Sequence, residues 1–136
     1  MYIKQVSMGL VTANCYVICD EVSKVGAVID PGDYSTQLEN EIILSGMKEL
    51  KYILLTHGHF DHILGVSGLK KATGAQVVIH NDDADFLIDP KKSLAENNFP
   101  EPQIPVEADI KVADGDELFL GEEKITVVST PGHTMG

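Results

Sequence analysis

The sequence has few basic residues. Lysine and arginine together number 10 in 136 residues, against 21 aspartates and glutamates, and the formal net charge is −11. The largest basic clusters are the pairs Lys70-Lys71 and Lys91-Lys92. Binding to a phosphate backbone needs a basic stripe, so we expect no nucleic-acid partner. The acidic balance instead indicates a solvated surface that keeps the protein soluble.

Long apolar runs and cysteines are also scarce. No run approaches the roughly 20 apolar residues of a membrane span, and residues 1–5 show no signal-peptide pattern. The two cysteines, Cys15 and Cys19, lie four apart in one apolar stretch, where direct pairing is geometrically poor. We interpret them as buried free thiols and expect a reducing, cytoplasmic environment without a membrane partner. With 43% hydrophobic and 23% charged residues, residues 1–136 are typical of a single globular domain.

Four of the five histidines fall in two short motifs. Residues 56–65 read THGHFDHILG and place His57, His59, Asp61 and His62 directly after an apolar run, and residues 130–134 read TPGHT and place His133 after another. Side chains at i and i+2 of an extended segment point the same way, so His57 and His59 can offer two imidazoles to one cation. Imidazole and carboxylate without thiolate is the ligand set of zinc, iron or manganese. The sequence therefore predicts a metal site.

A simpler interpretation treats the first motif as a helix start. Asp61 is a plausible N-cap for a helix whose apolar face includes Ile63 and Leu69 and which ends before Gly74. The histidines would then be ordinary loop residues. Three protonated imidazoles at one turn would repel one another, however, and a cation between them removes that repulsion.

The remaining pattern predicts alternating strands and helices. Strands are expected at Tyr2 to Val6, Asn14 to Cys19, Val25 to Asp30, Lys51 to Thr56, Gln76 to His80, Glu117 to Leu120 and Lys124 to Ser129. Helices are expected from the capping-box pattern at Thr36 to about Leu44, after Asp61, and from a cap at Asn81 through Leu87. Asp89 to Pro105 is expected to be a long loop bordering a substrate cleft.

At these motifs the chain resembles the metallo-β-lactamase fold superfamily, and within it the glyoxalase II-like hydrolases. The signature His-x-His-x-Asp-His appears intact at 57–62, TPGHT resembles the next ligand motif, and residues 27–32, AVIDPG, resemble a strand end near the metals. The resemblance implies an α+β fold, an αββα sandwich of which this chain would be the N-terminal portion. It also implies that His57, His59 and His133 hold one metal, while Asp61 and His62 contribute to a second. Two zinc ions are expected, with iron or manganese as alternatives.

The function that the resemblance implies is hydrolysis by metal-activated water, acting on a thioester, lactone or related small acyl substrate. Asp61 is expected to be catalytic, as metal ligand and as orienter or proton acceptor for the water. Asp30 either fixes its own turn or orients a ligand histidine by accepting a hydrogen bond from it. His80 is expected to be a hydrogen-bonded structural residue.

The sequence also departs from that family. Family members continue past TPGHT to a bridging Asp and a last His, and neither residue type follows His133 here. We therefore expect a fragment of a longer protein, whose uncovered sheet edge would pair with a second copy as a homodimer. Two alternatives stay open: a persulfide dioxygenase-like mononuclear iron enzyme, and a non-catalytic metal-binding fragment.

Overall fold

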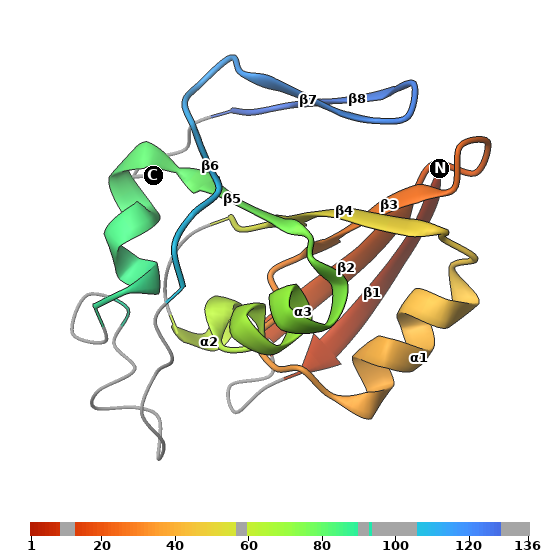
Figure 1. The fold of residues 1–136 in the computed structure, drawn as a ribbon, viewed down its shortest axis with the longest axis horizontal. Helices are drawn as coiled ribbons and strands as arrows, with labels where there is room; N and C mark the ends of the chain where they lie inside the picture. The colour runs from red at the N-terminus through yellow and green to blue at the C-terminus, as the bar shows by residue number, and fades with distance from the viewer. Residues whose placement is uncertain (9–12, 57–59, 90–92, 94–105, 129–136) are drawn as a thin grey trace.

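A six-stranded mixed sheet forms the centre of the molecule (Figure 1). The computed structural model describes residues 1–8, 13–56, 60–89, 93 and 106–128, and of residues 8, 13, 60 and 61 it describes the backbone alone. The strands follow one another in the order β1 (Tyr2–Met8), β2 (Ala13–Cys19), β3 (Val25–Ile29), β4 (Glu49–Leu54), β5 (Gln76–His80) and β6 (Ile110–Val112). β1, β2 and β3 pair antiparallel, whereas β3 to β6 run parallel.

Helices follow the strands as the sequence predicts, with differences at their starts. They are α1 (Thr36–Leu44), α2 (Phe60–Ile63), α3 (Val66–Thr73) and the 3-10 helix η1 (Asn81–Leu87). The N-cap of α1 is Ser35, whose hydroxyl accepts from the Leu38 N–H at 3.3 Å, so the capping pattern expected at Thr36 begins one residue earlier. His80, not Asn81, caps η1. In the described part of the chain every helix is shorter than a bilayer span, α1 being nine residues long.

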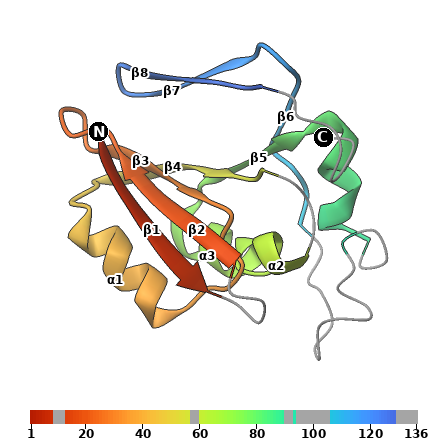
Figure 2. The same cartoon turned by 180° about the vertical axis from the view of Figure 1, so that it is seen from behind.

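The helices cover one face of the sheet, and a second small sheet covers part of the other. Figures 1 and 2 show α1, α2 and α3 below the sheet and the antiparallel hairpin β7 (Glu117–Leu120) and β8 (Glu123–Thr126) above it. This arrangement confirms the expected α+β class. Strand β6 was not predicted, and the strand expected at Lys124 to Ser129 is shorter and begins at Glu123.

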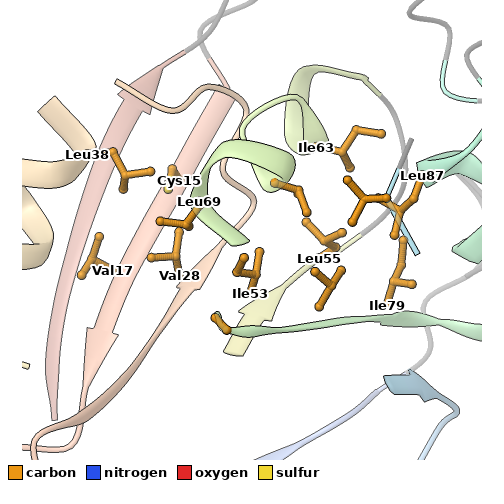
Figure 3. Packing of buried hydrophobic residues seen from close by; sticks show 14 of the residues in the cluster. Cys15, Val17, Val28, Leu38, Ile53, Leu55, Ile63, Leu69, Ile79 and Leu87 are labelled. Carbon is orange, nitrogen blue, oxygen red and sulfur yellow. The ribbon is translucent and has the colours of Figure 1, made fainter. Parts of the chain in front are cut away.

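Side chains alternate between two hydrophobic cores because successive residues of a strand point to opposite faces. The core under the helices contains Val17, Val28 and Ile53, which meet Leu38 and Leu69 from α1 and α3 (Figure 3). Strands that are buried on both faces need apolar residues throughout, which explains the continuous apolar runs of the parallel strands. The second core lies under the hairpin and contains Ala27, Tyr52, Val78, Val112, Leu118 and Leu120.

Candidate metal centre

The first metal motif follows β4 at the carboxyl end of the parallel strands. In open sheets of this kind ligands bind beyond those ends, because neighbouring strands deliver their following loops to one place. β3 ends next to Asp30 and β5 ends at His80 on the same edge. Of the predicted ligands, His57, His59 and His133 lie outside the described residues, as does the side chain of Asp61. His62, on α2, is the ligand whose side chain is described.

Asp30 is the buried carboxylate of this edge. Its residue is 3% exposed, and its backbone adopts the left-handed conformation, with φ +55°, directly after β3. Aspartate tolerates this region better than most residues, yet the conformation is costly and is maintained by its surroundings. The Asp30 N–H donates to the carbonyl of Leu54 at 2.9 Å, and its own carbonyl accepts from Gly32 N–H at 2.9 Å. The turn therefore fixes the direction of the Asp30 side chain.

The carboxylate of Asp30 connects two segments of the site. Oδ1 accepts from the backbone N–H of Thr56 at 2.7 Å, and Oδ2 accepts from the Thr56 hydroxyl at 2.5 Å. Oδ2 also lies 2.9 Å from Nδ1 of His62. Thr56 is the residue immediately before His57, so one buried carboxylate holds both the start of the metal motif and its last member. Asp30 therefore both fixes its own turn and contacts a histidine of the motif, and metal binding by His62 stays a prediction.

The Asp30 contact determines which nitrogen of His62 suits a metal. A carboxylate acceptor at Nδ1 selects the tautomer with the proton on that nitrogen, which directs coordination to Nε2. Carboxylate–histidine pairs of this kind accompany metal ligands in many metalloproteins. An imidazole Nε2 is a donor that zinc and iron bind, so His62 by itself is compatible with either metal. Within the described residues no three His, Cys, Asp or Glu side chains gather as a complete site.

A backbone contact places the junction between α2 and α3 against the same turn. The N–H of Gly65 donates to the carbonyl of Pro31 at 2.7 Å. A Cβ on Gly65 would lie 2.5 Å from the carbonyl carbon and oxygen of Asp33, closer than side chains approach backbone atoms. The single helix expected after Asp61 is consequently two helices, α2 and α3, with the break at this contact.

Helix α2 begins one residue before Asp61. The expected N-cap role of Asp61 is therefore wrong: the residue lies inside the first turn, where its backbone is helical. The prediction that Asp61 is a catalytic metal ligand concerns a side chain outside the described set. Sequence reasoning missed Thr56, whose only signal is its place between the apolar strand and the first motif histidine.

A cavity of about 280 Å³ lies beside these residues, between the large sheet and the hairpin. Its walls are mainly apolar and include Leu54, Val78 and Val112 from the sheet and Leu118, Ile125 and Val127 from the hairpin region. Thr56 and His80 contribute polar groups to the lining. The structural role expected for His80 is confirmed, because its Nδ1 accepts from the Asp82 N–H at 3.0 Å and so caps η1.

Comparison with known proteins gives the family. The family model of the metallo-beta-lactamase superfamily matches residues 8–136. The chain therefore belongs to that superfamily. It is 32% identical over 136 residues to an uncharacterised protein of Mycobacterium leprae, covering 94% of this chain and 61% of that protein. It is also 32% identical over 137 residues to a hydroxyacylglutathione hydrolase of Cereibacter sphaeroides, covering 93% of this chain and 44% of the hydrolase.

Solved structures agree with this membership. The crystal structure of BLEG-1, a B3 metallo-β-lactamase, matches with a TM-score of 0.88 and 28% identity, over 99% of this chain and 64% of that one. ETHE1 from Myxococcus xanthus matches with a TM-score of 0.70 and 25% identity, over 98% of this chain and 50% of that one. The chain thus spans between about two fifths and two thirds of the length of these relatives.

Proposed function

We propose that the complete protein is a metal-dependent hydrolase that cleaves a thioester, lactone or related small acyl substrate. The observation that carries this proposal is the Asp30–His62 contact, 2.9 Å long, at the end of an intact His-x-His-x-Asp-His motif. The buried carboxylate at Nδ1 of His62, a helix residue whose side chain is 19% exposed, holds the imidazole in one orientation and so prepares it for coordination. Relatives named hydroxyacylglutathione hydrolase support the reaction class.

Each residue around the turn has a definable task. Asp30 holds the proton at Nδ1 of His62 and keeps the imidazole plane fixed. Through Thr56, the same carboxylate fixes the point at which His57 leaves β4. His57, His59 and His133 would hold one metal, while Asp61 and His62 would contribute to a second. A metal held there would lower the pKa of bound water toward about 7 and would polarise a carbonyl oxygen of the substrate.

Two smaller proposals accompany the hydrolase. We propose zinc as the metal, since nitrogen and carboxylate ligands suit it. We also propose the cytoplasm as the compartment, supported by two buried free thiols, Cys15 and Cys19.

Metal removal tests the proposal. The complete protein is stripped with a chelator and reloaded with zinc, with iron, or with magnesium as the matched control, because magnesium prefers oxygen ligands. Hydrolysis of a 2-hydroxyacyl glutathione thioester, a lactone and a β-lactam is then followed. We expect turnover of the thioester or the lactone that zinc restores and magnesium does not. Hydrolysis that survives complete metal removal, or no hydrolysis of any acyl substrate, would contradict the proposal.

A mononuclear iron enzyme of the persulfide dioxygenase-like type is the second candidate. Its ligand set would be closely similar to the one predicted for the hydrolase. Iron in the purified protein together with oxygen consumption on a persulfide would select this candidate. Absence of any turnover in a confirmed natural 136-residue protein would instead support a non-catalytic metal-binding role.

A further inference from the structure

One residue supplies two of the three hydrogen bonds that described residues make to the Asp30 carboxylate. Thr56 donates its backbone N–H to Oδ1 at 2.7 Å and its hydroxyl to Oδ2 at 2.5 Å. The third contact is that of His62, whose Nδ1 lies 2.9 Å from Oδ2. The torsion that rotates an aspartate carboxylate is soft, and one hydrogen bond does not fix it. Donors from one residue to both oxygens fix the plane of this carboxylate.

The backbone that carries the Thr56 hydroxyl is itself held from both neighbouring strands. The Asp30 N–H donates to the carbonyl of Leu54, and the Leu55 N–H donates to the carbonyl of Val78 in β5, each at 2.9 Å. Threonine is also β-branched, so its side chain has few rotamers. The hydroxyl is therefore a rigid reference point next to a carboxylate that would otherwise rotate.

The hydroxyl also decides where the imidazole of His62 can bind. Each carboxylate oxygen has two lone pairs, and a short O–H···O⁻ contact is of the strong, charge-assisted kind. Since the Thr56 hydroxyl occupies one lone pair of Oδ2, Nδ1 of His62 is directed to the other. Helix α2 has four residues, too few to be stable by itself, so the helix alone does not hold the ring in place.

We propose that Thr56 is a positioning residue for His62, acting with its hydroxyl through the carboxylate of Asp30. Thr56 is not a metal ligand in this assignment. It selects one orientation of the imidazole, with the proton on Nδ1 and with Nε2 as the coordinating nitrogen. The inference rests on the proposed metal-dependent function and deepens it, because it adds a residue outside the His-x-His-x-Asp-His motif that sets zinc affinity.

The zinc affinity of the complete protein, measured by competition with a chromophoric chelator, is the first test. Thr56→Val keeps the shape of the side chain and removes the hydroxyl, whereas Thr56→Ser keeps the hydroxyl. We expect zinc to bind about tenfold more weakly to the valine variant, the lower end of the range for loss of such a partner. The serine variant should bind zinc as the unaltered protein does. Equal losses in the two variants would overturn the role of the hydroxyl.

Thr73→Val is the matched control. Thr73 is also exposed, and its hydroxyl donates to the carbonyl of Leu69 at 2.7 Å, at the end of α3. This variant loses a side-chain hydrogen bond away from the site, so its zinc affinity should be unchanged. If Thr73→Val and Thr56→Val weaken zinc binding equally, loss of stability is the cause and the proposal is wrong.

The route through Asp30 is tested with Asp30→Gly. Glycine adopts positive φ without steric cost, so this variant keeps the conformation of residue 30, at φ +55°, and removes the carboxylate. In this background Thr56→Val should weaken zinc binding no further, because the hydroxyl acts through a group that is gone. The same loss in both backgrounds would refute this route.

Nitrogen-15 NMR of the metal-free complete protein separates this inference from the proposed function. In alkaline buffer, where histidine is neutral, it reports which ring nitrogen of His62 carries the proton, without metal and without turnover. We expect the Nδ1–H form in the unaltered protein and in Thr56→Ser, and a mixture of both forms in Thr56→Val.

The two measurements can disagree in two informative ways. The expected NMR result, combined with a zinc affinity that not even Asp30→Gly changes, would keep the positioning role and refute the metal centre. A single Nδ1–H form in Thr56→Val, combined with zinc binding that Asp30→Gly weakens and Thr56→Val does not, would keep the metal centre and refute the role of Thr56.

Discussion

Asp30 and His62 meet across 32 positions of sequence, with Oδ2 of the first 2.9 Å from Nδ1 of the second. The pair joins the turn after β3 to helix α2, and Thr56 joins the same carboxylate from β4. A single side chain thus sets the relative position of the segments that begin and end the His-x-His-x-Asp-His motif. This relationship generates the first prediction.

Replacing Asp30 by Asn should weaken metal binding. The amide lacks the negative charge that raises the basicity of His62, and loss of such a partner typically costs 10–100-fold in metal affinity. Competition with a chromophoric zinc chelator measures the change. Asp20→Asn is the matched control, because Asp20 is also a buried carboxylate in a turn but hydrogen-bonds to Ser23, at the opposite end of β3. Equal zinc affinity in the two variants would show that Asp30 fixes only its own turn.

Replacing Asp61 by Ala should lower kcat by orders of magnitude in the complete enzyme while the fold stays intact. The expected reason is that the Asp61 carboxylate acts on the attacking water rather than on the helix start, which lies one residue earlier. Steady-state kinetics together with circular dichroism measure both effects. Near-normal hydrolysis by the folded variant would refute the catalytic role.

Replacing Gly65 by Ala should destabilise the protein by about 1–3 kcal/mol, because the new methyl group would meet backbone atoms of Asp33 that cannot rotate away. Gly68→Ala is the matched control in the same region: its methyl would meet the Tyr34 ring, a side chain that can turn. Urea unfolding of both variants gives the comparison. A Gly65 variant no less stable than the Gly68 variant would mean that the turn after β3 yields easily.

Alkaline pH should destabilise the protein through Cys15. Burial, followed by the nearby charge of Asp30, raises the pKa of this thiol from its ordinary 9.0 to about 12. In the unfolded chain the thiol ionises first, so above pH 9 unfolding releases a proton, and stability falls by up to about 1.4 kcal/mol per pH unit until pH 12. Cys15→Ala should flatten this part of the stability profile in urea titrations between pH 8 and 11.

The matched substitution for this test is Cys19→Ala, at the other buried thiol on the same face of β2. Burial also raises the pKa of the Cys19 thiol, though by less than that of Cys15, so this variant should keep most of the decline. Identical pH profiles for the two variants would contradict Cys15 as the main source.

The 136-residue chain alone should associate with a second copy. In the described residues β8 pairs with β7 and presents its other edge, and Ile3 is 64% exposed on the face of the sheet that bears the hairpin. Exposed apolar surface and an open strand edge favour pairing. Light scattering after size exclusion is expected to show a dimer that Ile3→Lys weakens and Ile43→Lys, on the exposed side of α1, does not. A stable monomer that melts cooperatively at micromolar concentration would refute this prediction.

Much of the fold follows from local pattern. β5 and β7 have the predicted bounds, Gln76–His80 and Glu117–Leu120, because each is an apolar or alternating run between turn residues. β6 could not be predicted in the same way. It has three residues, and it is extended because β5 pairs with it and Asp109 N–H donates to the carbonyl of Val77 at 2.9 Å.

The site shows the same division between local and tertiary information. The motif histidines are visible in the sequence because their spacing is local. The break between α2 and α3 is not, because it arises from the close approach of Gly65 to the turn at Pro31. Likewise, Thr56 has no distinguishing pattern and acquires its role only when Asp30, 26 residues earlier, comes within hydrogen-bond distance.

The hairpin β7–β8 has a consequence for how the molecule opens. Its four-residue strands form their ladder with each other, whereas β1 to β6 share one continuous ladder. Two-stranded units are marginal without packing, so this hairpin depends on the apolar contacts of Leu118 and Leu120 beneath it. Its amide protons should therefore exchange with deuterium long before those of β3 and β4. The hairpin would therefore unfold locally as a unit, whereas the strands of the large sheet on the other side of the cavity would unfold only together with the whole domain.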